Sequence, residues 1–323
     1  MTPIVAADIG GTHARFALAD VDGGNVRSIT LARTFRTEEH ADLHSAWQAF
    51  GATLGTALPR AAAIAIAAPI RGEAIKLTNQ GWVIHPERLP EQLGVDRLLL
   101  INDFGALGHA VARAGAEHLR PLCGPDVPLP AAGVIGIVGP GTGLGVAQLW
   151  RGEQGYVVIE TEGGHMDFAP LDPIEDRLLA HMRPRFGRVS VERLVSGPGL
   201  AAIRAALAAD EGGAPPLPDN ATLWAAALDG SDRLAAYSLD RLCLALGAFA
   251  GDIALAQGAA GMVIVGTLAQ RFADRLSGSG FAARFAAKGR FEQAMAGLPV
   301  KLLTLEQPGL HGAAAAFAQR YGA

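Results

Sequence analysis

Asn102 and Asp103 follow the apolar run Leu98–Ile101, which has the pattern of a buried strand. Polar residues at the end of such a strand lie where open sheets bind ligands. A carboxylate at that position can accept the proton of a hydroxyl group when a phosphoryl group is transferred to an alcohol. Asp103 is therefore a candidate general base, and Asn102 can donate to and accept from hydroxyl groups. An alternative role for Asp103 is the N-cap of a helix that starts near Gly105.

The segment Glu160–Phe168 places carboxylates and an imidazole around a Gly-Gly turn. Glu162 and His165 are three residues apart, so both side chains can converge on adjacent hydroxyls, as in a polyol site. A solvated turn with a surface histidine is the alternative. A metal site has little support, because no second histidine stands at ligand spacing. Glu192 has a weaker signal, since a glutamate in a first helical turn commonly just complements the helix dipole.

Two Gly-Thr turns have the composition of phosphate-binding loops. The first is Asp8-Ile9-Gly10-Gly11-Thr12 and the second is Gly139–Gly145, which contains Gly141-Thr142-Gly143. Glycine can adopt a positive φ and lets backbone N–H groups approach phosphate oxygens. Thr12 can donate its hydroxyl to a phosphate, and Asp8 can hold a water of hydrated Mg²⁺. The first loop alone could be a plain hairpin, but the pair suits opposite sides of one phosphate chain.

These loops differ from the commonest nucleotide-binding motifs. Neither turn ends in Gly-Lys-Ser or Gly-Lys-Thr, so a Walker A loop is absent. Strands rather than helices are expected after both turns, which disfavours a dinucleotide-binding fold.

The elements that must position these residues form two similar sets. The pattern predicts a meander with strands 4–7, 15–19 and a third through Leu31, and a second meander with strands 134–138, 146–150 and 156–159. Aligning Gly11-Thr12 with Gly141-Thr142 suggests the duplication of one unit. Further predicted elements are helices 41–58, 234–257 and 312–321, strands 61–68, 97–101 and 262–265, and a loop at 210–220. The alternation of strand and helix after a meander indicates an α/β protein with mixed sheets.

Composition narrows the class further. At 323 residues, 50% of them hydrophobic, the chain is long enough for two domains. The net charge of −4, without a basic block, argues against a nucleic-acid partner. Cys123 and Cys243 form no CxxC pair, which argues against disulfides and thiolate zinc. We expect a cytoplasmic protein, because no signal peptide or membrane span is recognisable.

Taken together, several segments resemble the bacterial glucokinase family of the hexokinase, Hsp70 and actin ATPase superfamily. They are DIGGTHARFAL (8–18), LTNQGW (77–82), INDF (101–104), GPGTGLG (139–145), EGGHMDFAP (162–170), ERLVSGPGL (192–200), the stretch from Gly280 to Phe291, and PGL-x-G at 308–312. The match runs in order over nearly the whole chain. The combination is highly specific, although no single piece is.

The resemblance implies a two-lobed, actin-like ATPase (ribonuclease H-like) fold with duplicated mixed-sheet domains. The small lobe would comprise residues 1–112 and 306–323 and the large lobe 113–305, with the active site in the cleft between them and a homodimer formed through the large lobe. The implied reaction transfers a phosphoryl group from MgATP to the 6-hydroxyl of glucose, with Asp103 as base.

The resemblance also implies residue roles. The sugar would be held by Asn102, Asp103, Glu162, His165 and Glu192. The nucleotide would be held by Ala7, Asp8, Ile9, Gly10, Gly11, Thr12, Gly141, Thr142, Gly143 and Gly266, with Asp8 next to Mg²⁺. Val265-Gly266-Thr267-Leu268 stands where the adenosine loop of the family usually has a Gly-Gly pair. The zinc motif of the related ROK kinases is absent, so the resemblance favours a zinc-free, non-ROK glucokinase.

Other functions stay open at this stage. They are a kinase for another hexose, a glucokinase that uses polyphosphate, a catalytically silent sugar sensor and, least favoured, an actin-like polymer. The sensor is disfavoured because Asp103 and both phosphate loops are present, and the polymer would have no use for Glu162 and His165.

Overall fold

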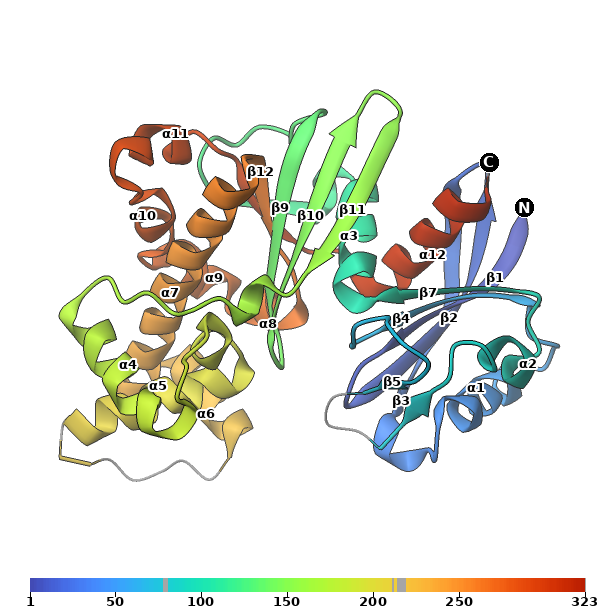
Figure 1. The fold of residues 1–323 in the computed structure, drawn as a ribbon, viewed down its shortest axis with the longest axis horizontal. Coiled ribbons are helices and arrows are strands. Elements are labelled where there is room, and N and C mark those ends of the chain that lie inside the picture. The colour runs from blue at the N-terminus through green and yellow to red at the C-terminus, as the bar shows by residue number, and fades with distance from the viewer. Residues whose placement is uncertain (78–80, 211, 214–218, 323) are drawn as a thin grey trace. The chain divides into compact units, whose positions relative to one another are not determined.

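A computed structural model describes residues 1–77, 81–210, 212–213 and 219–322. The chain divides into two compact units, each with its own sheet (Figure 1). Unit 1 comprises Met1–Ala114 and Leu305–Ala323, and unit 2 comprises Gly115–Thr304.

Unit 1 is built on a five-stranded mixed sheet in the order β3-β2-β1-β4-β7. The strands are β1 (Thr2–Ile9), β2 (His13–Asp22), β3 (Asn25–Arg36), β4 (Ala61–Ile66) and β7 (Arg97–Asn102). β1, β2 and β3 are antiparallel neighbours, whereas β1, β4 and β7 run parallel. The β2–β3 turn needs its glycines, because Gly23 and Gly24 have φ of 53° and 75°.

Helices cover both faces of this sheet, because β1 buries alternate side chains on opposite sides. Val5, Ala7 and Ile9 pack in one core with α1 (Leu43–Ala52) and α2 (Leu89–Leu93). Ile4 and Ala6 pack in another with α3 (Asp103–Arg113) and α12 (Pro308–Tyr321). α12 lies very close to its neighbours: a Cβ on Gly312 would meet the Ala106 carbonyl oxygen at 1.7 Å, so only glycine fits there.

Unit 2 contains a six-stranded sheet in the order β11-β10-β9-β12-β13-β8. The strands are β8 (Leu119–Cys123), β9 (Gly133–Pro140), β10 (Leu144–Gly152), β11 (Gly155–Thr161), β12 (Ala259–Ile264) and β13 (Val300–Leu303). β9, β10 and β11 are antiparallel, and β9, β12 and β13 are parallel. The first five strands therefore repeat the order and directions of the unit 1 sheet.

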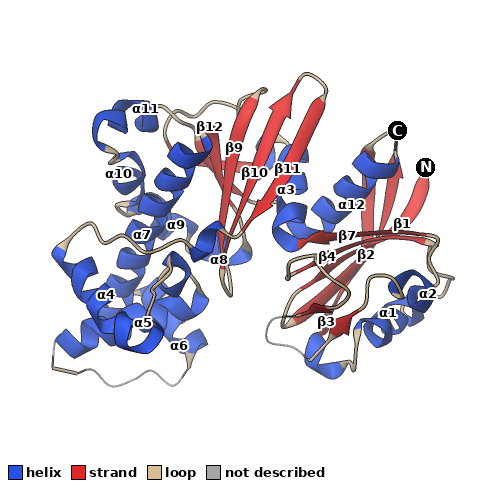
Figure 2. Ribbon diagram, viewed as in Figure 1, coloured by secondary structure: helices blue, strands red, loops and turns tan. Residues whose placement is uncertain are grey.

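The helices of unit 2 gather on one side of this sheet and bury one large core (Figure 2). They are α4 (Pro173–Phe186), α5 (Gly197–Asp210), α6 (Asn220–Asp229), α7 (Arg233–Gln257), α8 (Thr267–Arg271), α9 (Ala273–Gly278), α10 (Phe281–Ala286) and α11 (Glu292–Ala296). The central α7 contributes Leu239, Leu242, Leu246 and Phe249 to the core. Across the described residues, no helix is long and apolar enough to span a bilayer.

The smaller elements complete the chain. A two-stranded sheet joins β5 (Ile75–Lys76) to β6 (Val83–Ile84). The 3₁₀ helices are η1 (Thr37–Glu39), η2 (Ala116–His118), η3 (Gly163–His165), η4 (Val191–Arg193) and η5 (Gly289–Phe291).

Both predicted meanders and the mixed α/β class are confirmed. The predicted helix 41–58 is too long: α1 ends at Ala52, where the Thr53 hydroxyl donates to the Phe50 carbonyl and Gly55 has a φ of 67°. Residues 78–80 of the LTNQGW motif and residues 211 and 214–218 of the predicted 210–220 loop lie outside the described residues.

Candidate functional site

Three parallel strands of unit 1 have their carboxyl ends at the same edge of the sheet. In their register, Ile9 of β1 is opposite Ile66 of β4, which is opposite Asn102 of β7. The first glycine loop follows β1 and Asp103 follows β7. The strand register therefore brings the predicted base and the predicted phosphate loop to one edge, where open sheets bind ligands.

Asn102 fixes the start of α3. Its Oδ1 accepts hydrogen bonds from the backbone N–H groups of Phe104 (2.9 Å) and Gly105 (3.4 Å), and its Nδ2 donates to the Ala68 carbonyl (3.2 Å). The capping role considered for Asp103 was therefore assigned to the wrong residue, because Asn102 is the N-cap. Asp103 is the first helical residue, and its Oδ1 accepts from the Phe104 N–H at 3.0 Å. A helix N-terminus stabilises the ionised form of a carboxyl group placed there.

The first glycine loop is held by a residue that sequence analysis did not select. Thr37 begins η1 and is fully buried. Its backbone N–H donates to the Thr12 carbonyl and its Oγ1 donates to the Gly11 carbonyl, both at 3.0 Å. The Gly10 N–H donates to the His13 carbonyl at 2.9 Å. Gly10 does not have the positive φ that the sequence led us to expect.

Asp8, predicted to face Mg²⁺, lies opposite Arg15 in the β1–β2 ladder. Arg15 Nη1 is 3.2 Å from Asp8 Oδ2, and the Asp8 side chain is 20% exposed. Burial raises the pKa of Asp8, and the charge and hydrogen bond of Arg15 oppose that rise. Gly309, near the start of α12, packs against this carboxylate, because a Cβ there would lie 2.6 Å from Asp8 Cγ. The side chains of Ala7 and Ile9 are fully buried beneath the loop.

The second glycine loop is braced from two helix starts in unit 2. The Gly197 N–H at the start of α5 donates to the Gly141 carbonyl at 2.7 Å, and the Gly141 N–H donates to the Gly143 carbonyl at 2.8 Å. Gly266, the N-cap of α8, has a φ of 101°, and a Cβ on it would lie 3.0 Å from the Pro140 carbonyl oxygen. Thr142 is exposed, and a Cβ on Gly141 would meet no atom within 4 Å. The tip of the loop is therefore open to a ligand.

Glu192 is tied to this loop, which its sequence context did not predict. It lies in η4 rather than in the first turn of an α-helix, and its Oε2 accepts from the Leu144 N–H at 3.0 Å. Gly143 leaves room for that carboxylate, because a Cβ there would lie 2.4 Å from Oε2. Gly164 packs against Leu144, because a Cβ added to Gly164 would lie 1.7 Å from the Leu144 carbonyl oxygen.

Glu162 and His165 approach each other across η3, as their spacing predicted. Glu162 Oε2 lies 3.9 Å from His165 Nε2, and their side chains are 68% and 54% exposed. Arg188 Nη1 braces the turn by donating to the His165 carbonyl and to Asp167 Oδ1, both at 2.7 Å. Because η3 packs on Leu144 and Glu192 binds Leu144, the predicted polyol residues and the second loop form one cluster within unit 2.

A cavity of about 740 Å³ is lined mainly by residues of α7 and α9, with Arg271 at the end of α8. Its lining residues are Leu228, Asp240, Leu244, Arg271, Phe272, Asp274, Arg275, Gly278, Ser279 and Gly280. Arg275 donates two hydrogen bonds of 2.6 Å to the carboxylate of Asp240, and Arg120 donates one of 2.7 Å to Asp274. Arg271 is the last residue of α8, the helix whose N-cap is Gly266.

The described residues contain no group of three or more His, Cys, Asp or Glu arranged to hold a metal ion. This donor set fits Mg²⁺ only if phosphates and water supply most of its ligands and Asp8 supplies one contact through water. Thr37 was missed because it stands in no recognised motif, and Gly197 was missed because its motif, ERLVSGPGL, does not indicate a contact with the second loop. Their contribution is a hydrogen bond to a loop more than 20 residues away in sequence.

The comparisons with known proteins agree over almost the full length of the chain. A family model described as Glucokinase matches residues 5–320. The chain is 58% identical to a glucokinase of Zymomonas mobilis subsp. mobilis over 98% of each chain. Its structure matches the crystal structure of a glucokinase from an Antarctic psychrotroph with a TM-score of 0.84, at 33% identity over 98% of each chain.

A more distant match concerns the fold alone. It is a ROK family glucokinase from Streptomyces griseus in complex with glucose and AMPPNP, with a TM-score of 0.65 and 18% identity, covering 98% of this chain and 99% of that one.

Proposed function

Because the chain belongs to the glucokinase family, we propose that Asp103 is the general base of its reaction, the ATP-dependent phosphorylation of glucose. The observation that carries this assignment is the strand register, which sets Asp103 and the first glycine loop at one edge of the unit 1 sheet. Asp103 would accept the proton of the 6-hydroxyl as that oxygen attacks the γ-phosphorus of ATP. The products are glucose 6-phosphate and ADP.

We assign sugar binding to Asn102 in unit 1 and to Glu162, His165 and Glu192 in unit 2. Asn102 uses one N–H to hold Ala68, and the amide group has a second N–H for a sugar hydroxyl. Glu162 and His165, 3.9 Å apart and exposed, suit two adjacent hydroxyls. Glu192 binds Leu144 through Oε2, and a carboxylate has further acceptor sites for a hydroxyl. A carboxylate and imidazole set of this kind reads the hydroxyl pattern of a hexose.

The two glycine loops would hold the phosphates of ATP. Gly10, Gly11 and Thr12 form the first contact, and Gly141, Thr142 and Gly143 form the second, with open space at Gly141. Mg²⁺ supplies charge neutralisation on the phosphates when bound, and Asp8 would orient one of its waters. Arg15 favours the ionised form of Asp8 that this role needs. Ala7 and Ile9 would act by supporting the loop rather than through their buried side chains.

The adenosine end would lie along α8. Gly266, its N-cap, is against Pro140 at the base of the second loop, and Arg271 at the other end of the helix lines the cavity. Five helical residues span about 7.5 Å, which suits the reach from the phosphates to the base of a nucleotide. The single glycine before Thr267 would then provide the close backbone approach that the family usually obtains from two.

The finer fold assignment is a two-lobed, actin-like (ribonuclease H-like) ATPase with duplicated domains. It is supported by the shared order of five strands in the two sheets and by the matching Gly-Thr turns between β1 and β2 and between β9 and β10. The two compact units would correspond to the two lobes, with residues 1–112 and 306–323 in the smaller one and 113–305 in the larger one. We also assign the chain to the zinc-free, non-ROK type.

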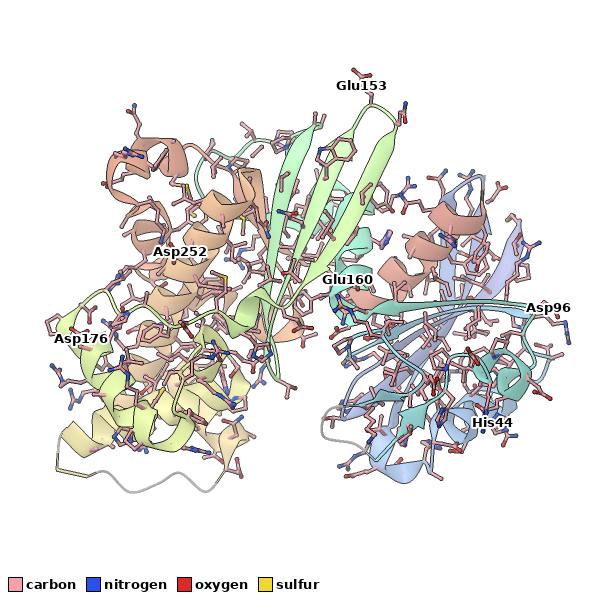
Figure 3. The ribbon with its side chains drawn as sticks, in the orientation of Figure 1. His44, Asp96, Glu153, Glu160, Asp176 and Asp252 are labelled. Carbon is pink, nitrogen blue, oxygen red and sulfur yellow. The ribbon has the colours of Figure 1, made fainter. Side chains whose placement is uncertain are left out.

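A homodimer formed through unit 2 and a cytoplasmic location complete the proposal. Trp150, Val157 and Ile159 are each about half exposed on one face of the β10–β11 hairpin, whose tip carries Glu153 (Figure 3). Such an apolar face on an edge hairpin supports an interface between subunits. Cys123 and Cys243 are free thiols, which fits a reducing compartment.

The decisive experiment couples ADP release to an optical readout over a panel of hexoses. Glucose should give turnover well above the sugar-free ATPase rate. A clear preference for mannose or fructose would replace glucose as substrate and leave the class of enzyme unchanged. Sugar binding by calorimetry without turnover would instead identify a sugar sensor.

A further inference from the structure

We propose that Thr37 is a positioning residue for nucleotide binding, because its hydroxyl orients the first glycine loop so that loop N–H groups face the phosphates. The inference rests on the proposed role of this loop and adds a residue that lies outside it. Thr37 is 26 residues from Gly11 in sequence and is fully buried.

The geometry follows from the planarity of the peptide bond. In a trans peptide the C=O of one residue and the N–H of the next point in opposite directions. Thr37 Oγ1 donates to the Gly11 carbonyl, so the Thr12 N–H points away from Thr37. The Thr37 N–H donates to the Thr12 carbonyl, so the His13 N–H does the same. Two successive N–H groups aimed to one side make a concave site for an anion.

No described residue accepts a hydrogen bond from the Thr12 N–H, so this donor is available to a ligand. Thr37 itself is firmly placed. It follows the pairing of Arg36 with His13 at the end of β3, and the His40 N–H donates back to the Thr37 carbonyl at 3.2 Å. The Trp82 indole donates to the His40 carbonyl at 3.0 Å, which fixes the other end of η1.

The second loop has the same arrangement, which argues against chance. Gly141 precedes Thr142 as Gly11 precedes Thr12, and the Gly141 carbonyl accepts from the Gly197 N–H at 2.7 Å. In each loop, therefore, a donor from a later segment holds the carbonyl of the glycine before threonine. The donor is a backbone group in unit 2 and a side-chain hydroxyl in unit 1, so only the unit 1 donor can be removed by substitution.

The test compares Thr37→Val, which keeps the shape and removes the hydroxyl, with Thr37→Ser, which keeps the hydroxyl. The matched control is Thr34→Val on β3, because Thr34 is exposed and is paired with Arg15 of β2 rather than with the glycines of the loop. Thr37→Val should raise the KM for ATP and the Kd for MgADP by at least about fivefold, the usual effect of losing one buried hydrogen bond. The Kd for glucose should not change, and Thr37→Ser should restore most of the nucleotide affinity.

Calorimetry with MgADP and with glucose keeps the result interpretable. If Thr37→Val binds MgADP as tightly as the wild type, or if Thr37→Ser is as weak as Thr37→Val, the proposal is wrong. A Thr37→Val protein that loses glucose and MgADP binding equally would show a purely structural role. A wild-type protein that binds MgADP but does not phosphorylate glucose would contradict the proposed function and leave this binding test valid.

Discussion

The carboxylate of Glu192 accepts a hydrogen bond from the backbone N–H of Leu144, 48 residues away in sequence, at 3.0 Å. Leu144 begins β10, directly after the loop Gly141–Gly143, and its carbonyl oxygen is in close contact with Gly164 of η3. One residue thus connects the proposed phosphate loop to the proposed sugar residues. Glucose binding at Glu192 would therefore influence how well the loop is held for the nucleotide.

Gly143→Ala tests this connection. The new Cβ would lie 2.4 Å from Glu192 Oε2, so the carboxylate must move and lose its hydrogen bond from the Leu144 N–H. We expect a loss of about 1.5–3 kcal/mol in stability, typical of a broken hydrogen bond to a charged group. The KM values for glucose and ATP should both rise. Thermal unfolding and initial rates measure the two effects.

The control for Gly143→Ala is Gly141→Ala, whose Cβ meets nothing within 4 Å and which should leave the melting temperature unchanged. The double variant Gly143→Ala/Glu192→Ala should be no less stable than Glu192→Ala, because the carboxylate that clashes is gone. Strictly additive losses in the double variant would show that the two residues do not interact.

Asp103→Asn should abolish most turnover and keep the fold and glucose binding. Asn102 rather than Asp103 caps α3, so the substitution removes the base without removing the cap. We expect kcat to fall by about 10²- to 10⁴-fold, the usual contribution of a general base. Calorimetry should give a glucose Kd close to that of the wild type. A kcat within about tenfold of the wild-type value would rule out this role.

The strands of both meanders could be predicted because strand alternation and glycine turns are local signals. Asp22-Gly23-Gly24-Asn25 is an example, since its two positive φ angles require glycine. The end of α1 could not be predicted, because it depends on a hydroxyl of Thr53 that bonds its own helix. Local pattern determines which elements exist, whereas their ends depend on individual hydrogen bonds.

The site was predictable to the extent that chemistry and motif coincide in sequence. Asp103 follows a strand, and Glu162 and His165 share a short turn, so both features could be recognised. The bond from Glu192 to Leu144 and the bonds from Thr37 to the first loop join distant segments. Such contacts exist only after the chain has folded, and no pattern in the sequence indicates them.

Asp8→Asn should lower activity yet stabilise the protein at neutral pH. Burial raises the pKa of Asp8, so the folded state binds its proton more tightly than the unfolded state. Its contribution to the free energy of unfolding is therefore largest below the ordinary aspartate pKa of about 3.9 and falls as the pH rises through the raised value. An uncharged Asn avoids that cost, so the gain in melting temperature should be larger at pH 7.5 than at pH 4.5.

Asp22→Asn, an exposed carboxylate at the β2–β3 turn, serves as the control and should show no such pH-dependent gain. A melting temperature for Asp8→Asn that is lower than the wild-type value at pH 7.5 would mean that the Arg15 pair outweighs the cost of burial. Loss of the charge should raise the KM for MgATP more than the KM for glucose.

Arg271→Gln tests the adenosine end of the nucleotide site. Arg271 of α8 lines the cavity of about 740 Å³, so its loss should raise the KM for ATP several-fold and leave the KM for glucose unchanged. The control is Arg290→Gln, because Arg290 lies over the Phe291 ring and is not part of the cavity lining. Equal KM values for ATP in Arg271→Gln and the wild type would show that the adenosine does not bind in this cavity.

Asp172→Asn should destabilise unit 2 in a pH-dependent way. Asp172 caps α4 and pairs with Arg241, whose side chain is 6% exposed, at 2.6 Å. Burial alone would raise the pKa of Asp172. The Glu175 N–H, Arg241 and Arg284 together outweigh burial and lower this pKa to about 2. The stabilisation is thus complete above the unfolded pKa of about 3.9 and is lost as the pH falls toward 2.

Asn keeps the cap but not the charge, so the variant should melt several degrees lower at pH 7, and the difference should shrink between pH 4 and pH 2. Asp96→Asn is the control, because Asp96 pairs with Arg60 on the surface (Figure 3) and such pairs contribute little. Asp172 is the last residue of the segment that connects η3 to α4. The KM for glucose should therefore rise in Asp172→Asn but not in the control Asp96→Asn. A deficit that stays constant from pH 7 to pH 2 would show that the charge of Asp172 does not carry the effect.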